Sequence, residues 1–153
     1  MYTSDELLAT LAEAVAVAFR ELAGVEAAPL NSRTVSGAEG FADVSAVLAV
    51  TTPAGPGYFV LSFSDDHGTA LAKRVLADLG ADPEPGVIRD CLGEVVNVVA
   101  GQAKTLLYGT PLHFTLATPT VVAGAPALAN AERLLVTFAG ELGEFTLHVR
   151  LPA

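Results

Sequence analysis

The chain has 153 residues, of which 52% are hydrophobic and 16% are charged, a composition that excludes disorder and predicts one domain over residues 1–153 with a substantial core. A formal net charge of −9 with only eight Lys and Arg residues excludes the basic cluster that binding to DNA or RNA requires. No apolar run is long enough to span a bilayer, and the N-terminus lacks a signal-peptide pattern. The single cysteine allows no internal disulfide. We therefore expect a cytoplasmic protein without a nucleic-acid or membrane partner.

An amphipathic helix is predicted near the N-terminus. Thr3 and Glu6 have the spacing of a capping box, and apolar residues then recur at helical spacing as far as Gly24. The polar face of this helix carries mainly glutamates, whereas a helix that lies on a membrane surface has a basic face. We therefore expect the helix to pack on a sheet.

Three strands are predicted next, over residues 32–37, 41–52 and 58–63. The last two flank a Pro-Ala-Gly-Pro-Gly segment at 53–57, which indicates a hairpin whose loop is too rich in proline for the tightest turns. Neither a Gly-Lys-Ser/Thr nor a GxGxxG sequence accompanies these glycines, so we exclude a phosphate-binding loop.

A second helix is predicted from Ser64, a good N-cap residue, to Gly80. Asp65, Asp66 and His67 are the residue types that bind metals, but three adjacent side chains point in different directions. The two aspartates suit the positive end of the helix dipole. We therefore expect them to cap the helix rather than to bind a metal.

The segment 89–109 is predicted to be a long helix with one unusual face. Polar and small residues recur in it at spacings of four and three, which places them in one stripe along the helix. The residues of this stripe are Asp90, Glu94, Asn97, Gly101, Lys104 and Tyr108. The predicted core face consists of Ile88, Cys91, Leu92, Val95, Val99, Ala103 and Leu106. A glycine in mid-helix costs about 1 kcal/mol relative to alanine, so we expect another group to approach closely at Gly101.

This stripe is either a solvated face or a surface for a partner. Glu94 and Asn97 lie three residues apart, so both can reach one point on a partner. Asp90 and Glu94 are spaced for a carboxylate dyad, although no apolar neighbour in the sequence favours one. Cys91 lies on the core face and is interpreted as a buried structural thiol. The three histidines lack the spacing of a metal site, so no metal is expected on the chain.

Three more strands are predicted, over residues 113–122, 133–138 and 144–151, with the last two joined as a second hairpin. In the last strand apolar residues alternate with polar ones, which predicts that it is half exposed.

The order of elements is therefore one helix, three strands, two helices and three strands. Residues 34–37 and 120–124 have similar sequences, and each segment follows a helix and precedes a hairpin. This similarity favours an internal duplication of a unit with one helix and three strands.

Residues 93–104, Gly-Glu-Val-Val-Asn-Val-Val-Ala-Gly-Gln-Ala-Lys, resemble the GExxNxxAG signature of the CheX-like chemotaxis phosphatases, relatives of CheC and FliY. Residues 118–124, Thr-Pro-Thr-Val-Val-Ala-Gly, are similar to the TPPTVVSG stretch that follows this helix in CheX. The order of elements fits over nearly the whole chain. The resemblance implies an α/β (α+β) fold, in which helix and three-strand units repeat around a β-sheet, and a homodimer formed by continuing that sheet.

The resemblance also implies dephosphorylation of the phospho-aspartate of a CheY-type response regulator. In that family the Asn of the motif orients the attacking water and the Glu contacts the receiver at its conserved Lys, which assigns these roles to Asn97 and Glu94. Asp90, Gly101 and Lys104 would then belong to the partner-binding surface. The Mg²⁺ of the reaction is expected on the receiver and no cofactor on this chain. A neutral amide suits the task, because a carboxylate facing the phosphoryl group would repel it.

Two other functions stay open at this point. One is a non-catalytic module of the same fold that binds receivers through the same helix. The other is an assembly subunit related to flagellar switch proteins, for which pairing of sheets is the whole purpose.

Overall fold

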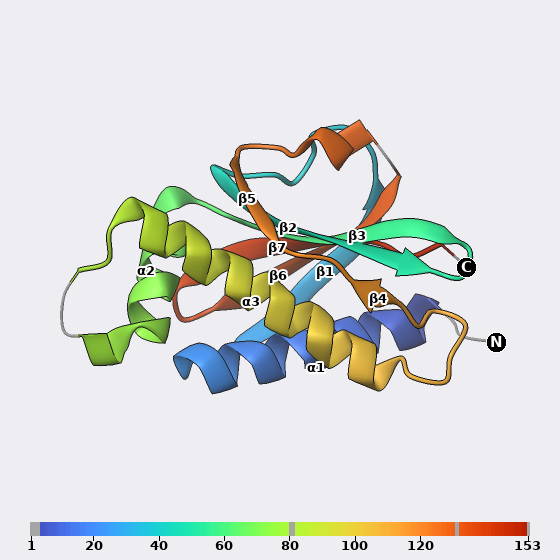
Figure 1. Cartoon of the computed structure of the whole chain (residues 1–153), viewed down its shortest axis with the longest axis horizontal. Helices are drawn as coiled ribbons and strands as arrows, with labels where there is room; N and C mark the ends of the chain where they lie inside the picture. The colour runs from blue at the N-terminus through green and yellow to red at the C-terminus, as the bar shows by residue number, and fades with distance from the viewer. Residues whose placement is uncertain (1–3, 80–81, 131, 153) are drawn as a thin grey trace.

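The computed structural model describes residues 4–79, 82–130 and 132–152. Helices α1 and α3 lie side by side on one face of a seven-stranded antiparallel sheet (Figure 1). The elements in chain order are α1 (Ser4–Ala23), β1 (Ala27–Val35), β2 (Val44–Thr52), β3 (Gly55–Phe63), α2 (Asp65–Val75), the 3-10 helix η1 (Ala77–Leu79), α3 (Pro85–Leu106), β4 (Thr115–Leu116), β5 (Thr120–Ala123), the 3-10 helix η2 (Ala127–Asn130), β6 (Arg133–Gly140) and β7 (Gly143–Arg150). None of the helices within these ranges combines the length and hydrophobicity that crossing a bilayer requires.

Helix α1 confirms the predicted first helix and packs its apolar stripe between the sheet and α3. The buried residues of this stripe are Leu11, Ala14, Val15, Ala18 and Phe19. The helix ends at Ala23, and Gly24 follows it with φ +66°, a conformation that glycine adopts without strain at a helix C-terminus. The expected cap residue Thr3 lies outside the described residues.

The N-terminus of α2 is capped as predicted. The Ser64 hydroxyl accepts a hydrogen bond from the backbone N–H of His67 at 3.1 Å. The Asp43 carboxylate accepts a second bond from the N–H of Asp65 at 2.9 Å, which ties the start of α2 to the residue before β2. The helix ends at Val75 and a 3-10 turn follows it, while the predicted end at Gly80 lies outside the described residues.

The strand order is β1-β6-β7-β3-β2-β4, and β5 also pairs with β2. The predicted strand 113–122 is wrong, because two short strands, β4 and β5, occupy this segment and pair with different parts of β2. Pro119 lies between them and has no N–H to donate to a strand ladder. Strand β1 also begins five residues earlier than predicted, at Ala27 instead of residue 32.

Both hairpins have two-residue loops, so the expectation of a looser turn at residues 53–57 is wrong. Thr52 pairs with Gly55 across the first turn, and Gly140 pairs with Gly143 across the second. In the first turn the Thr52 hydroxyl accepts from the N–H of Ala54 at 3.2 Å and donates to the carbonyl of Gly55 at 3.0 Å. Gly55 has φ +139°, a value that residues with a side chain rarely adopt.

The sheet order agrees with an internal duplication. When β1, β2 and β3 are exchanged with β5, β6 and β7, the order β1-β6-β7-β3-β2-β5 reads the same in reverse. The two central strands, β3 and β7, are counterparts that pair with each other, and the helices that precede the two units, α1 and α3, lie side by side. The fold therefore consists of two units with one helix and three strands, plus the inserted α2 and the short β4.

The face of the sheet opposite α1 and α3 carries a buried polar cluster. Arg133 donates from Nε to Nδ1 of His148 at 2.8 Å, and its guanidinium lies 4.6 Å from the ring centre of Phe41. The Phe41 ring stacks on His148 at 3.9 Å between ring centres, and Nε2 of His148 lies 3.2 Å from the carbonyl oxygen of Gly40. The prediction of a half-exposed strand β7 is therefore wrong at His148, which is fully buried.

Burial lowers the pKa of His148 to about 3, and the positive charge of Arg133 acts in the same direction. An unfolded histidine has a pKa of about 6.5, so between these two values the unfolded chain binds one more proton than the folded chain. The contribution of neutral His148 to the free energy of unfolding is therefore complete above pH 6.5. It is lost progressively as the pH falls below this value. Burial also lowers the pKa of His67, which adds to the effect.

We expect His148 to lower the free energy of unfolding by on the order of 2 kcal/mol between pH 6.5 and pH 5. Urea unfolding at these two pH values measures this, with His148→Gln as the comparison because glutamine has no proton to gain and retains an acceptor for Arg133. The difference in the free energy of unfolding between the two pH values should be smaller in the variant by about this amount. An equal pH dependence in both proteins would contradict the assignment.

Candidate functional site

Helix α3 contains most of the predicted segment 89–109 but ends before residue 109. It begins at Pro85, which suits the first turn because its missing N–H would have no partner there, and it ends at Leu106. The buried residues of α3 are Cys91, Leu92, Gly93, Val95, Val96, Val99, Ala100 and Ala103. The predicted core face is wrong at Leu106, which is 41% exposed, and Tyr108 lies beyond the end of the helix.

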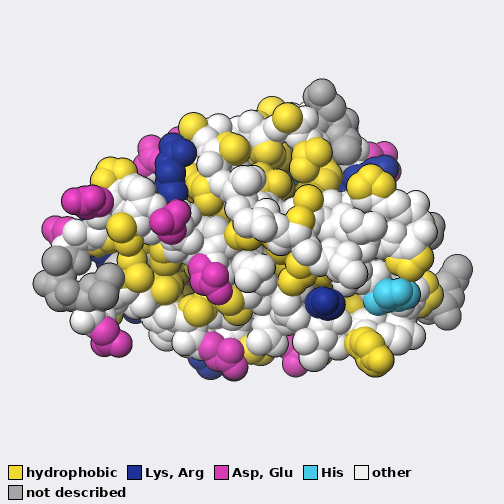
Figure 2. Space-filling view, viewed as in Figure 1, with side chains coloured by type: hydrophobic (Ala, Val, Ile, Leu, Met, Phe, Trp, Pro, Cys, Tyr) yellow, Lys and Arg dark blue, Asp and Glu magenta, His cyan; other side chains and the backbone are white. Residues whose placement is uncertain are grey.

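The remaining stripe residues lie on the outer face of α3. Asp90, Glu94 and Lys104 are exposed, while Asn97 and Gly101 are half-buried. Asn97 is therefore less exposed than its charged neighbours but still accessible to a partner. Figure 2 shows this side of the molecule, where acidic side chains are spread over the face that α1 and α3 form and Lys and Arg side chains are few.

The four charged side chains of α3 near the stripe make no ion pair with the part of the chain that the structure describes. Among the described residues, four ion pairs form, and none of them includes Arg89, Asp90, Glu94 or Lys104. The side chain of Asn97 likewise makes no hydrogen bond within the described part of the chain. Each of these groups is therefore available to a binding partner without first breaking an internal contact.

The sequence suggested a close approach to α3 at Gly101, but this prediction is wrong. The approach occurs at Gly93. No described group lies within 4 Å of the position that a Cβ atom at Gly101 would take. At Gly93 that position lies 3.6 Å from Cγ2 of Val121 and 3.7 Å from the ring of Pro119. The segment before β5 and the strand itself therefore pass over the helix at Gly93, at ordinary van der Waals distances from this position.

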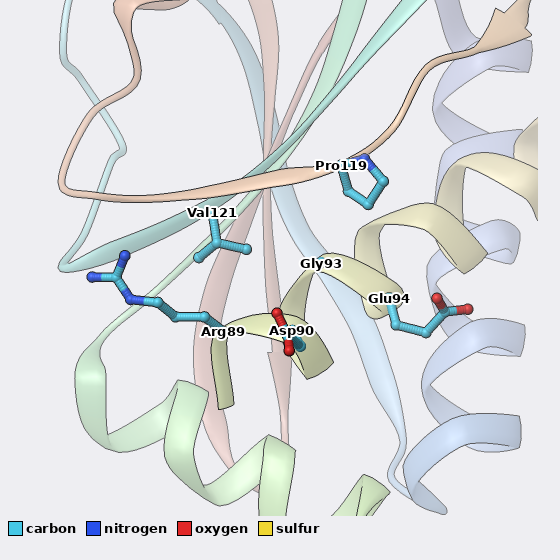
Figure 3. Close-up of a pocket in the computed structure, with 6 residues that line it drawn as sticks. All are labelled: Arg89, Asp90, Gly93, Glu94, Pro119 and Val121. Carbon is cyan, nitrogen blue, oxygen red and sulfur yellow. The ribbon is translucent and has the colours of Figure 1, made fainter. Parts of the chain in front are cut away.

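A pocket of about 330 Å³ lies where this segment crosses the helix. We refer to it as the notch, and its lining residues are Arg89, Asp90, Gly93, Glu94, Pro119 and Val121. Figure 3 shows Asp90 between two side chains that extend in opposite directions, Arg89 on one side and Glu94 on the other. The notch therefore adjoins Glu94, one of the two residues assigned by the motif.

A buried hydrogen-bond group holds the end of β5, and with it the wall of the notch. The carbonyl of Asp43 accepts from the N–H of Gly124 at 2.8 Å. The Ser45 hydroxyl donates to the carbonyl of Gly124 at 2.7 Å and lies 3.0 Å from the Ser62 hydroxyl. Ser45 and Ser62 are fully or almost fully buried. Sequence reasoning missed these positioning residues, because serines in a strand carry no signal of a contact that is 79 residues away.

Cys91 lies on the inner side of α3 and is 6% exposed, which confirms the interpretation as a buried thiol. Burial raises the pKa of the Cys91 thiol, and the negative charge of Glu94 raises it further. The protonated thiol is a weak nucleophile, which argues against covalent catalysis through this residue. Within the ranges that the structure describes, no three His, Cys, Asp or Glu residues are grouped to hold a metal ion.

The chain matches the family described as "Chemotaxis phosphatase CheX" over residues 44–148. A similar solved structure is a chemotaxis protein CheX from Desulfovibrio desulfuricans, with 25% identity, a TM-score of 0.83 and coverage of 95% of this chain and 99% of that one. A CheX from Vibrio vulnificus has 21% identity, a TM-score of 0.78 and coverage of 94% and 97%.

The chain is also similar to one in the CheX-CheY-BeF3-Mg+2 complex from Borrelia burgdorferi, with 15% identity, a TM-score of 0.73 and coverage of 96% and 98%. No curated protein matches the sequence. These structural neighbours have the α+β fold that the sequence predicted.

Proposed function

The chain belongs to the CheX chemotaxis phosphatase family, and we propose that it hydrolyses the phospho-aspartate of a CheY-type response regulator. The observation that carries this proposal is the placement of Asn97. Its uncharged amide is half-buried at the middle of the outer face of α3, without an internal partner among the described residues, and the unpaired Glu94 lies three residues before it. The proposed place of action is the cytoplasm.

In the proposed reaction Asn97 orients a water molecule for attack on phosphorus. The amide oxygen accepts a hydrogen bond from the water, and the amide N–H₂ can donate to the water or to a phosphoryl oxygen. As the water oxygen bonds to phosphorus, the bond between phosphorus and the aspartyl oxygen breaks. The receiver recovers its carboxylate, and inorganic phosphate leaves with the protons of the water.

This chain has little else to supply, because an aspartyl phosphate is a reactive mixed anhydride. Mg²⁺ on the receiver would neutralise the charge that develops on the phosphoryl oxygens, as metal ions do in other phosphoryl transfers. Positioning a reactant is worth several kcal/mol in well-oriented reactions, so one well-placed amide is sufficient to accelerate hydrolysis.

Glu94 would dock the receiver by pairing with a lysine. Its carboxylate is exposed and free of internal ion pairs within the described residues, so pairing does not compete with a contact inside the chain. Lys104 lies seven residues after Asn97, roughly 10 Å along the helix axis, which is too far to touch the same phosphoryl group. We assign Lys104, together with Gly101, to the rim of the contact.

The similar chain in the Borrelia burgdorferi structure is bound to CheY with BeF3 and Mg²⁺, which supports a receiver domain as the partner. Small amounts of this protein should shorten the lifetime of a phosphorylated receiver in the presence of Mg²⁺. A receiver that binds without decaying faster would instead favour the non-catalytic module. An assembly subunit would be insensitive to changes at Asn97 and Glu94 but sensitive to changes at the sheet edges.

We also propose that the chain forms a homodimer through β1. This strand pairs only with β6 in the described part of the chain, so its other edge is open, and seven of its nine residues are exposed. Unpaired backbone groups along such an edge are a template for a strand of a second chain. Leu30 on this strand is 56% exposed, although apolar side chains of this size are usually buried.

Leu30→Lys should therefore weaken the dimer, by about tenfold or more, because it replaces an exposed apolar side chain of this edge by a charge that both copies would bring to the interface. Sedimentation equilibrium of the unchanged protein and the variant measures this. Leu128→Lys is the matched control, since Leu128 is 41% exposed and lies on the 3-10 helix η2, which is not part of the β1 edge. A monomeric unchanged protein, or equal dimerisation of both variants, would argue against pairing through β1.

A further inference from the structure

We infer that the notch is a second docking subsite, which takes a basic side chain of the receiver. The inference rests on the proposed function, since it assumes that a receiver domain docks on the outer face of α3. It adds a contact that the Glu and Asn of the motif do not make and that involves Asp90, Gly93 and Pro119.

The shape of the notch suits the stem of a long side chain. Gly93 is buried and contributes no side chain to the floor, while Pro119 and Val121 supply apolar walls from the crossing segment. Lysine and arginine side chains bury their aliphatic stems along such surfaces and keep the charged end in water. The pocket volume of about 330 Å³ is ample for one side chain of this kind.

The charge of the notch favours a basic occupant. Asp90 is exposed, makes no ion pair among the described residues and lies at the middle of the notch (Figure 3). Arg89 extends away from Asp90 and therefore leaves this carboxylate uncompensated. Glu94 adds a second carboxylate at the other rim. A cation that enters along Gly93 would thus meet negative charge, in a chain whose net charge is −9.

This contact is distinct from the one assigned to Glu94. In Figure 3 the Glu94 carboxylate extends to the opposite side of Asp90 from Arg89, away from Val121 and the strand that forms the wall. A receiver lysine that pairs with Glu94 would leave Asp90 free for a second basic group. Two separated ion pairs fix the rotation of the receiver about Asn97, which a single pair does not.

Asp90 and Arg89, two of the three charged residues of the notch, give a test with opposite signs. The measured quantity is the dissociation constant for a receiver loaded with beryllofluoride and Mg²⁺, so it does not depend on turnover. Asp90→Asn should raise this constant by about three- to fivefold, the size expected for an exposed ion pair, and Arg89→Gln should leave it unchanged or lower it. The effect of Asp90→Asn should shrink at high salt.

The glycine gives an independent test of the shape. Gly93→Ala fits sterically, since the added methyl would lie at ordinary contact distances, and alanine favours a helix over glycine. The variant should therefore melt at the same or a higher temperature but bind the receiver several-fold more weakly, because the methyl fills the floor of the notch. Gly86→Ala is the matched control on the same helix, where nothing lies within 4 Å, and should leave binding unchanged.

Other outcomes separate the inference from the proposed function. Weaker binding by Arg89→Gln with no effect of Asp90→Asn would overturn the inference in favour of an acidic occupant. Unchanged binding by Asp90→Asn and Gly93→Ala would show that the notch stays empty in the complex. If the unchanged protein binds the receiver but does not accelerate its dephosphorylation, the proposed function fails and the dissociation constants still decide the inference. A protein that binds no receiver overturns both.

Discussion

The Asn97→Ala variant should lose on the order of 100-fold in the maximal rate of receiver dephosphorylation, which is the size of effect produced by misplacing a reacting group. Its affinity for the receiver should change little, because Asn97 is half-buried and one small amide contributes little to a docking surface. The physical reason is that the methyl group of alanine cannot hold the water in line with phosphorus. Stopped-flow or radiolabel decay of the phosphorylated receiver measures the rate, and binding is measured separately.

Two controls make this prediction specific. Gln102→Ala removes an amide from the same helix five residues later, which places it about 140° around the axis from Asn97, and should leave the rate unchanged. Asn97→Asp keeps the shape but adds a charge that repels the phosphoryl group, so it should also lose most of the rate. Glu94→Ala should show the opposite pattern to Asn97→Ala: it should bind the receiver more weakly but largely keep the maximal rate of dephosphorylation. If Asn97→Ala retains full activity, water positioning by this residue is wrong.

The Phe145→Ala variant should lose roughly 3–5 kcal/mol of the free energy of unfolding. Phe145 is 4% exposed and joins four elements through ring contacts. Its ring lies 4.7 Å from Phe19 of α1, 5.3 Å from Phe138 of β6, 5.4 Å from Phe63 of β3 and 5.5 Å from His67 of α2. Removing the Phe145 ring would leave a cavity between the helices and the sheet, and the four surrounding rings cannot fill it. Since small domains have a stability of about 5–15 kcal/mol, this variant would lose a large part of its stability.

Denaturant unfolding followed by far-UV circular dichroism measures the loss. Phe145→Leu retains part of the apolar volume and should lose clearly less than Phe145→Ala. Leu128→Ala is the surface control, since Leu128 is 41% exposed, and should change the stability by less than about 1 kcal/mol. A loss below about 1 kcal/mol for Phe145→Ala would mean that the aromatic cluster does not hold the elements together.

The helices and the motif on α3 could be predicted from the sequence because their signals are local. The spacing of apolar residues identified α1 and the core face of α3, and Ser64 identified the start of α2. The stripe from Asp90 to Lys104 follows from the geometry of one helix, which needs no information about the rest of the chain. Residues beyond Leu106 were wrongly included, since the sequence does not mark the exact end of that helix.

The rest depended on contacts between distant segments. The break between β4 and β5 follows from their separate pairing with β2, and the close approach at Gly93 follows from the path of residues 117–121 over α3. His148 was expected at the surface because its neighbours alternate, but the loop that carries Phe41 covers it. Pro119 is a local signal for the break between β4 and β5, but the other two features have no signature within a window of a few residues, so periodicity cannot reveal them.

The most direct test of the proposed function measures binding and decay together. A phosphorylated receiver with Mg²⁺ is mixed with increasing amounts of this protein or of Asn97→Ala, and the fraction bound and the rate of phosphate release are recorded at each concentration. The account predicts that the rate constant for decay rises with the bound fraction to a plateau for the unchanged protein. It predicts equal binding with a nearly flat rate for Asn97→Ala. Decay that stays at the intrinsic rate of the receiver when the unchanged protein is fully bound would contradict it.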